Sequence, residues 1–170
     1  MKEMWQLYDF NENPIEVVDR NNPQVWDKGM FHMGADIWII NDDKKILVQK
    51  RSKYKKLEPN VWAMTGGSVI YGETPTQTIV REAKEELGID LNPTRLQFMT
   101  EFKTQNVWVK TFILKQNLDI SQMIFSEDEV ADAKWLTWNE IDDLVKDNNF
   151  IQNRWNYVKD YLKEEICNET

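Results

Sequence analysis

Three glutamates share one face of a segment that the sequence marks as a helix, and they are the first candidates for chemistry. At about 100° per residue, Glu82, Glu85 and Glu86 fall within an arc of roughly 100°. Like charges at this spacing repel one another unless a cation neutralises them. Crowded carboxylate oxygens favour magnesium, manganese or calcium over zinc, which would call for histidine and cysteine ligands. The chain has one histidine and one cysteine, so the pattern predicts a site for a hard divalent cation.

The helix that carries these glutamates has clear signals at both ends. Thr74 is a suitable N-cap, Pro75 suits the first helical position, and Gln77 completes a capping-box pattern. Gly88 suits the left-handed C-cap. We therefore predict a helix over residues 75–87, with an apolar stripe that packs against a sheet. The stripe consists of Ile79, Val80, Ala83 and Leu87.

The rest of the chain reads as short strands and C-terminal helices. Apolar runs between turn-forming residues predict strands at residues 5–10, 15–19, 35–40, 46–48, 61–64, 96–103, 107–115 and 135–137. The Thr-Gly-Gly segment at 65–67 is expected to turn tightly or to approach a ligand. We expect a single α/β domain over residues 1–170, with helices packed on a mixed sheet, an N-terminal β-hairpin (about 4–20) and C-terminal helices (about 139–166).

Composition limits the classes of partner. The formal net charge of -8 argues against a nonspecific binder of nucleic-acid polymers, which needs cations to replace phosphate counterions. The longest apolar stretches, near residues 37–40 and 107–114, are far below the roughly 20 residues that cross a bilayer, so no membrane association is expected. Nothing marks the chain for export, and Cys167 has no second cysteine to pair with, so we expect a cytoplasmic protein.

From Gly67 to Ile89 the sequence matches the Nudix box, G-x(5)-E-x(7)-R-E-U-x-E-E-x-G-U, at every specified position. This resemblance implies a Nudix-type α/β/α sandwich with a loop-helix-loop metal site. It also implies that Mg²⁺ or Mn²⁺ is held by the three glutamates on the helix, helped by the Gly67 carbonyl. By position, Glu85, Glu82 and Arg81 form the catalytic set, in which Arg81 orients carboxylates. Glu73 and Gly88 would be structural.

The chemistry that the resemblance implies is hydrolysis of a phosphoanhydride bond in a small diphosphate-containing substrate. Such a reaction needs an activated water, masking of phosphate charge and a stabilised leaving group, all of which a divalent ion supplies. Glu82, Glu85 or an acidic residue from a distant loop could accept the proton. In the acidic run at residues 126–129, Glu129 is the first choice, both for this role and as a further metal ligand.

A second resemblance, over roughly residues 5–150, is to the isopentenyl-diphosphate-isomerase-like branch of Nudix proteins. It rests on Leu7-Tyr8-Asp9, residues 37–41, Gln49-Lys50-Arg51-Ser52 and Glu129-Val130 ahead of Trp135. In the isomerases a basic pair that corresponds to Arg51 and Lys55 grips the substrate diphosphate. Five of the seven residues from Lys50 to Lys56 are basic. A solvated, turn-forming loop is the alternative explanation of this run.

Two other functions compete with hydrolysis. An isomerase resembling this branch would use a cysteine in the strand before the box, and residues 61–65 contain none. A non-catalytic nucleotide-sensing module would usually lack the box glutamates or carry a DNA-binding segment, and neither sign is present.

Trp62 or Trp108 could stack on a base, but core packing is the expected role of each. The sequence is compatible with a monomer or with a homodimer in which the N-terminal hairpin lies across a partner.

Overall fold

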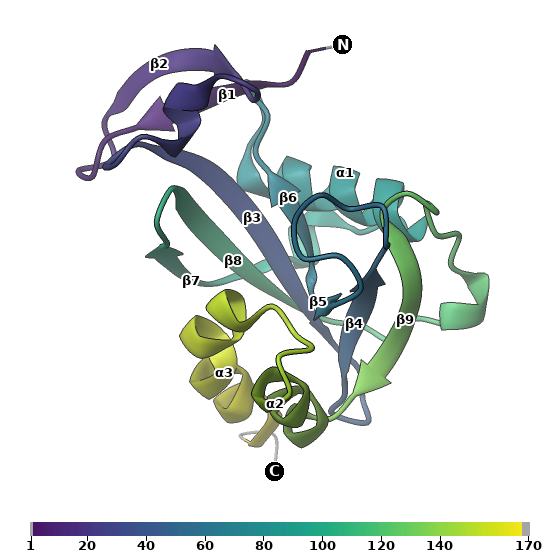
Figure 1. The fold of residues 1–170 in the computed structure, drawn as a ribbon. Helices are drawn as coiled ribbons and strands as arrows, with labels where there is room; N and C mark the ends of the chain where they lie inside the picture. Colours follow the sequence, from purple (N-terminus) through teal and green to yellow (C-terminus); the bar gives the residue numbers. More distant parts are fainter. Residues whose placement is uncertain (1, 168–170) are drawn as a thin grey trace.

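The computed structural model describes residues 2–167, and within them one mixed β-sheet lies between helices (Figure 1). The strands are β1 (Met4–Tyr8), β2 (Pro14–Asp19), β3 (Phe31–Ile40), β4 (Ile46–Arg51), β5 (Trp62–Ala63), β6 (Thr65–Ser68), β7 (Gln97–Lys103), β8 (Val107–Lys115) and β9 (Val130–Leu136). The α-helices are α1 (Pro75–Leu87), α2 (Trp138–Lys146) and α3 (Gln152–Cys167). Short 3-10 turns lie at Pro23–Trp26, Pro93–Arg95 and Ile120–Gln122.

Strand β3 organises the sheet. It pairs antiparallel with β1, β4 and β6, and parallel with β8 along nearly its whole length. Strand β4 also pairs with β5 and with β9, on its two opposite edges, and β7 pairs with β8. The combination of parallel and antiparallel pairs confirms the mixed sheet that the sequence predicts.

The alternation of side chains along β3 creates the two halves of the core. Ala35, Ile37 and Ile39 are buried against α1, and we call this side the α1 face. Trp38 and Ile40 point to the opposite side, where α2 and α3 pack, which we call the α3 face. Helices therefore cover both faces of the sheet, as Figure 1 shows, and the fold is the α/β/α sandwich expected.

Helix α1 begins and ends where the sequence predicts, because its signals are local. The Thr74 hydroxyl accepts from the Gln77 amide at 3.2 Å, and the Gln77 side chain accepts from the Thr74 amide at 2.8 Å. Gly88 closes the helix in the left-handed region, with φ of 70°. These contacts fix both ends of α1, and with them the orientation of the helix face that carries the glutamates.

Residues 65–67, expected to turn tightly or to approach a ligand, are part of strand β6, so the tight turn is wrong. Gly66 pairs with Asp36, and Gly67 pairs with Ala35. Any side chain on Gly66 would collide with the backbone of Ala35 and Asp36. Glycine therefore serves here to leave room for the backbone of β3 rather than to turn the chain.

The structure also moves some boundaries. Strand β9 starts at Val130, five residues before the expected strand at Trp135, and β3 starts at Phe31 rather than at Ala35. The two strands of the predicted N-terminal hairpin are β1 and β2, joined in antiparallel register. No helix within residues 2–167 is long and apolar enough to cross a membrane.

Candidate active site

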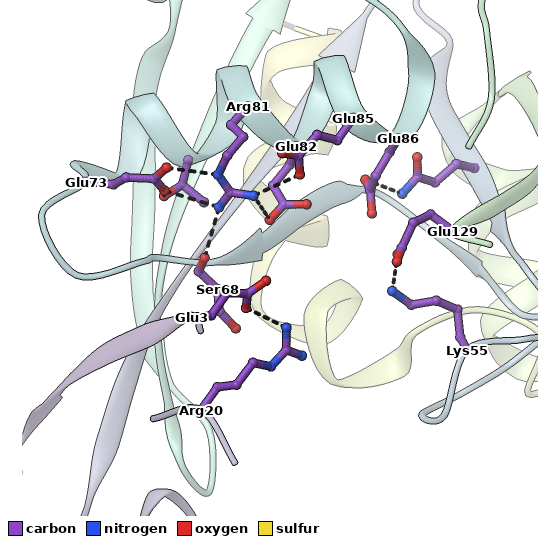
Figure 2. Close-up of polar contacts among 12 residues, drawn as sticks. Glu3, Arg20, Lys55, Ser68, Glu73, Arg81, Glu82, Glu85, Glu86 and Glu129 are labelled. Atoms are coloured by element: carbon purple, nitrogen blue, oxygen red, sulfur yellow. Dashed lines mark hydrogen bonds and ion pairs between the residues drawn. The ribbon is translucent and has the colours of Figure 1, made fainter. Parts of the chain in front are cut away.

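Arg81 is the centre of a network of carboxylates on α1 and on the loop before it. Its guanidinium donates to Glu73 at 2.9 Å, to Glu82 at 2.8 Å and to Glu85 at 3.1 Å. A further hydrogen bond, of 3.3 Å, reaches the Ser68 carbonyl at the end of β6 (Figure 2). Arg81 thereby fixes the positions of three acidic side chains relative to the strand that precedes the box.

Glu82 lies directly against the backbone of β6. Its carboxylate occupies the space where a side chain on Gly67 would be, so any side chain at that position would displace the carboxylate. The Glu82 side chain is 16% exposed. Burial raises the pKa of Glu82, and repulsion from Glu85 and Glu129 adds to the shift, although Arg81 opposes it. The net effect of these surroundings disfavours the charged form of Glu82.

Glu86 is the most deeply buried of the α1 glutamates, at 4% exposure. Gln49 of β4 donates to its carboxylate at 2.7 Å. Burial raises the pKa of Glu86 to about 8, with further increases from Glu82 and Glu129, while Gln49 and Lys55 act in the opposite direction. The carboxylate is therefore held by a neutral partner in a place that disfavours its charge.

Glu129 reaches the same region from the loop before β9, and Figure 2 shows it facing Glu86. It forms an ion pair with Lys55. The loop that carries Lys55 is tied to this segment, since the Ser52 hydroxyl donates to the Glu127 carbonyl at 2.7 Å and the Ser52 amide donates to the Glu129 carbonyl at 2.9 Å. Lys55 thus lies beside Glu129, the predicted further metal ligand.

Arg51 points elsewhere. Its guanidinium donates to the carbonyls of Leu57 and Glu58, at 2.8 and 3.1 Å. These bonds close the loop of residues 52–60 on itself. The two members of the expected basic pair therefore lie differently, with Lys55 on Glu129 and Arg51 within its own loop.

The donor set fits a hard divalent cation. Glutamate oxygens and a backbone carbonyl are the ligands that Mg²⁺ and Mn²⁺ take, and the raised pKa values of Glu82 and Glu86 are what a nearby cation would reverse. As the side chains lie within residues 2–167, no three His, Cys, Asp or Glu residues converge closely enough for one ion. Arg81, Gln49 and Lys55 hold the carboxylates that would have to converge.

Gln49 is the site residue that sequence reasoning missed. It lies 2% exposed in β4 and touches both Glu86 and, at 3.4 Å, the Thr65 hydroxyl. Gln49 is named in the patch Gln49-Lys50-Arg51-Ser52 of the second resemblance, but its signal as a site residue was only a polar side chain directly after the apolar run 46–48. That signal is weak, because polar residues commonly end a strand.

The other residues considered from the sequence are buried in the core or lie at the end of a helix. Trp62 and Trp108 are 6% and 7% exposed, which matches the expected core packing. Trp108 packs under Lys110, whose ammonium lies 4.0 Å from the ring centroid. His32 is buried and stacks on Trp5 at 4.0 Å, and burial lowers its pKa to about 4. Cys167 is exposed at the end of α3.

Comparison with known proteins gives a match to one family model and to several related proteins. The family model of the NUDIX domain matches residues 30–160. An uncharacterized Nudix hydrolase of Listeria monocytogenes is 37% identical over 128 residues, which cover 72% of this chain and 73% of that protein. One from Escherichia coli is 31% identical over 134 residues, covering 77% and 73%. An isopentenyl-diphosphate Delta-isomerase of Klebsiella pneumoniae is 26% identical over 136 residues, covering 76% and 73%.

Solved structures agree at the level of the fold. A Deinococcus radiodurans protein superimposes with a TM-score of 0.73 at 20% identity, covering 86% of this chain and 91% of its own. A MutT protein of Methanosarcina mazei gives a TM-score of 0.59 at 19% identity, covering 81% and 95%. At these identities the likeness concerns the arrangement of the chain alone.

Proposed function

The chain belongs to the Nudix hydrolase family, and from this premise we propose that it cleaves, with Mg²⁺ or Mn²⁺, a phosphoanhydride bond in a nucleoside diphosphate linked to a second group or in a related small diphosphate. The observation that carries the proposal is the group of carboxylates around Glu82 and Glu86, whose pKa values are raised by burial and further by the neighbouring carboxylates. Their negative charge is compensated when a divalent ion bridges protein and phosphate oxygens.

The proposed roles follow the contacts of each residue. Glu82, Glu85, Glu86, Glu129 and the Gly67 carbonyl would hold the metal. Arg81 would orient Glu82 and Glu85, while Glu73 holds Arg81 in turn. Lys55 would leave Glu129 for the substrate diphosphate once a metal neutralises that carboxylate. Arg51 would support the loop that carries Lys55, and Gly88 would end the helix.

Hydrolysis requires a water to attack one phosphorus while the bond from that phosphorus to the bridging oxygen breaks. When bound, a divalent ion masks phosphate charge and stabilises the leaving phosphate. Glu85 is the base that we favour for taking the proton of the attacking water. Its side chain is 57% exposed, whereas the Glu82 side chain is 16% exposed, so water reaches Glu85 most easily. Two monophosphate products result, and one of them carries the added oxygen.

The test is turnover with Mg²⁺ or Mn²⁺ of nucleoside diphosphate sugars, dinucleotide cofactors, nucleoside triphosphates and prenyl diphosphates. A phosphatase added afterwards converts monophosphate products to inorganic phosphate. We expect Glu85→Gln to lower kcat at least about 100-fold, the lower limit for loss of a general base. Asp90→Asn removes an exposed carboxylate beyond the helix end and should leave kcat within twofold. Turnover that needs no metal, or that survives Glu85→Gln, would contradict the proposal.

A second candidate, isomerisation of isopentenyl diphosphate, is favoured by the likeness to the Klebsiella enzyme. It needs an acid and a base at carbon. The residues expected to supply a cysteine acid read Val61-Trp-Ala-Met-Thr65, and the one cysteine of the chain is exposed at the end of α3. Prenyl diphosphates in the panel, analysed for isomer as well as for phosphate, distinguish the two reactions. Binding without turnover would instead support a sensing module.

A further inference from the structure

Gln49 of β4 is a buried polar side chain to which the proposed reaction gives no role. It is 2% exposed, and its cross-strand partners are the small residues Ala63 of β5 and Ala133 of β9. Its Nε2 donates to Glu86 Oε2 at 2.7 Å, and its Oε1 accepts from the Thr65 hydroxyl at 3.4 Å. Both polar ends of the carboxamide therefore have a partner inside the protein.

Thr65 gives this carboxamide its direction. A glutamine side chain donates from one end and accepts at the other, and a half-turn exchanges the two ends. The Thr65 hydroxyl, on a residue that is 4% exposed, donates to the accepting end. The N–H end is consequently turned toward Glu86. Thr65 of β6, Gln49 of β4 and Glu86 of α1 thus form a connected set, which we call the Gln49 triad.

Glu86 differs from the neighbouring glutamates in the charge of its hydrogen-bond donor. Every other glutamate of the predicted metal set is bound by a cation, either Arg81 or Lys55. The donor to Glu86 is the neutral Gln49. A lysine or arginine in that place would hold the carboxylate and also neutralise it. Glutamine fixes the position of the carboxylate and leaves its charge to a metal ion.

Gln49 also makes the two oxygens of the Glu86 carboxylate unequal. Oε2 accepts from Gln49, whereas within residues 2–167 no hydrogen bond reaches Oε1. Glu86 is 4% exposed, while the side chains of Glu85 and Glu129 are 57% and 38% exposed. The exposed carboxylates have room to move, and the buried one does not. Glu86 is therefore the fixed member of the set, with one oxygen free.

We propose that Gln49, oriented by Thr65, is a positioning residue that presents Glu86 to the metal through a single oxygen and thereby favours Mg²⁺ or Mn²⁺ over Ca²⁺. The inference rests on the metal site of the proposed function and names what selects its cation. Mg²⁺ demands near-ideal octahedral geometry, whereas Ca²⁺ takes about six to eight oxygens in a flexible site, often both oxygens of one carboxylate. A fixed carboxylate with one oxygen engaged suits the smaller ion.

The experiment measures cation binding to the metal-free full-length protein, without substrate. Electron paramagnetic resonance reports the free Mn²⁺ that remains in a titration, and Mg²⁺ or Ca²⁺ is added as a competitor. The ratio of the dissociation constant of Ca²⁺ to that of Mg²⁺ is the quantity compared. Gln49→Met removes the carboxamide and keeps a side chain of similar length. Thr65→Val removes only the hydroxyl, and it tests the inference even where Gln49→Met does not fold.

We expect the wild type to bind Mg²⁺ more tightly than Ca²⁺. Gln49→Met should raise the dissociation constant of Mg²⁺ about tenfold, the usual cost of losing a residue that orients a metal ligand. The dissociation constant of Ca²⁺ should rise less, because the released Oε2 of Glu86 becomes available to it. The ratio should therefore fall at least about fivefold in Gln49→Met and by a smaller factor in Thr65→Val.

Val48→Ala is the control. Val48 is 1% exposed and precedes Gln49 in β4, but its side chain packs in the core on the α3 face. The variant loosens the strand without touching the triad, and its ratio should stay within about twofold of the wild-type value. Equal weakening of both cations in Gln49→Met, an unchanged ratio in Gln49→Met and Thr65→Val, or an equally large change in Val48→Ala would overturn the inference.

Turnover separates this inference from the proposed function. A wild type that binds Mg²⁺ selectively, loses the selectivity in Gln49→Met and hydrolyses no diphosphate would support the inference and overturn the hydrolase. Hydrolysis by the wild type together with an unchanged ratio in the variants would do the opposite. Failure of the wild type to bind any of the three cations would overturn both.

Discussion

At the scale of single residues, the site consists of several carboxylates and of the few cationic or neutral side chains that bind them. Arg81 binds Glu73, Glu82 and Glu85, whereas the Glu86 carboxylate accepts its hydrogen bond from the neutral Gln49. The least compensated negative charge therefore lies at Glu86. Its protonation should govern how the metal-free protein responds to pH.

We predict that metal-free wild type loses stability as the pH rises from 5 to 9, and that Glu86→Gln removes most of this loss. The pKa of Glu86 is raised to about 8, so the folded protein binds this proton more tightly than the unfolded chain does. Its stabilising contribution is complete below the ordinary value of 4.5 and disappears as the pH passes about 8. Thermal unfolding should show Tm of the variant exceeding that of wild type by about 5 °C or more at pH 9.

Two controls accompany this measurement. Asp90→Asn, which removes an exposed carboxylate, should give a profile parallel to that of wild type. Added Mg²⁺ should raise the wild-type Tm more at pH 8 than at pH 5, because the cation binds the ionised carboxylates. Parallel profiles of Glu86→Gln and wild type would contradict the assignment of the pH response to this residue.

At the scale of elements, β6 and α1 form a unit in which a strand backbone and a helix face meet without a side chain between them. Gly67 provides this contact, since the Glu82 carboxylate fills the place of its missing side chain. Gly72, in the loop between the two elements, has an open surrounding and a φ of 94°. The two glycines are therefore needed for different reasons, one for contact and one for backbone conformation.

Replacing each glycine by alanine should separate activity from stability. Gly67→Ala forces the Glu82 carboxylate away from β6 and should lower kcat at least about 100-fold. Gly72→Ala meets no neighbouring atom but places alanine in the left-handed region, which costs about 1–2 kcal/mol of stability with little effect on kcat. Steady-state kinetics and urea unfolding of both variants check the distinction. Equal losses of kcat would show that Gly67 has no special relation to Glu82.

The cap of α1 should matter for stability alone. The Thr74 hydroxyl is the acceptor for the Gln77 amide, and the same arrangement recurs at Thr137 and Glu140 of α2. Thr74→Ala should lower the free energy of unfolding by about 1 kcal/mol. Thr137→Ala, at the helix away from the carboxylates, is the matched variant and should cost a similar amount. A large loss of kcat in Thr74→Ala at a temperature where it is folded would count against this account.

The elements also show which features a sequence can reveal. Helix α1 was predictable because Thr74, Gln77 and Gly88 act within the segment they bound. Strand β6 was not, because glycines disfavour strands and the reason for Gly66 is the backbone of β3, distant in sequence. The same limit applies to the contact between Gln49 and Glu86. The box identified one partner, but only the tertiary fold brings β4 to it.

At the scale of the whole molecule, the two faces of the sheet differ in the side chains that they carry. Helix α1 and its carboxylates lie on one face, while α2 and α3 cover the other with an aromatic core around Trp38, Phe150 and Trp155. The rings of Trp38 and Trp155 are 5.8 Å apart, and those of Trp138 and Trp155 are 5.3 Å apart. Trp155, which is fully buried, is thus one of the large side chains that join the C-terminal helices to the sheet.

Trp155→Ala should therefore destabilise the whole molecule. Removal of a buried aromatic side chain costs about 3–5 kcal/mol, and denaturant unfolding should show a single transition shifted by this amount. Tyr161→Ala, on the same helix but 47% exposed, should change the free energy of unfolding by less than about 1 kcal/mol. Unfolding of α3 in a separate, earlier transition would show that the helix is not part of the cooperative unit.

The parallel pairing of β3 with β8 has a consequence for how the chain reaches this structure during its synthesis. His32 pairs with Val107 and Ile40 with Lys115. The strand that pairs with one edge of β3 is therefore β8, which lies much later in the sequence and is synthesised after it. Long-range parallel pairing slows folding, because a large loop must close before its contacts form. While the ribosome completes the intervening segment, β3 exposes an apolar edge that is prone to aggregation. We therefore expect the arrival of residues 107–115, rather than formation of the helix that carries the glutamates, to set the pace of folding.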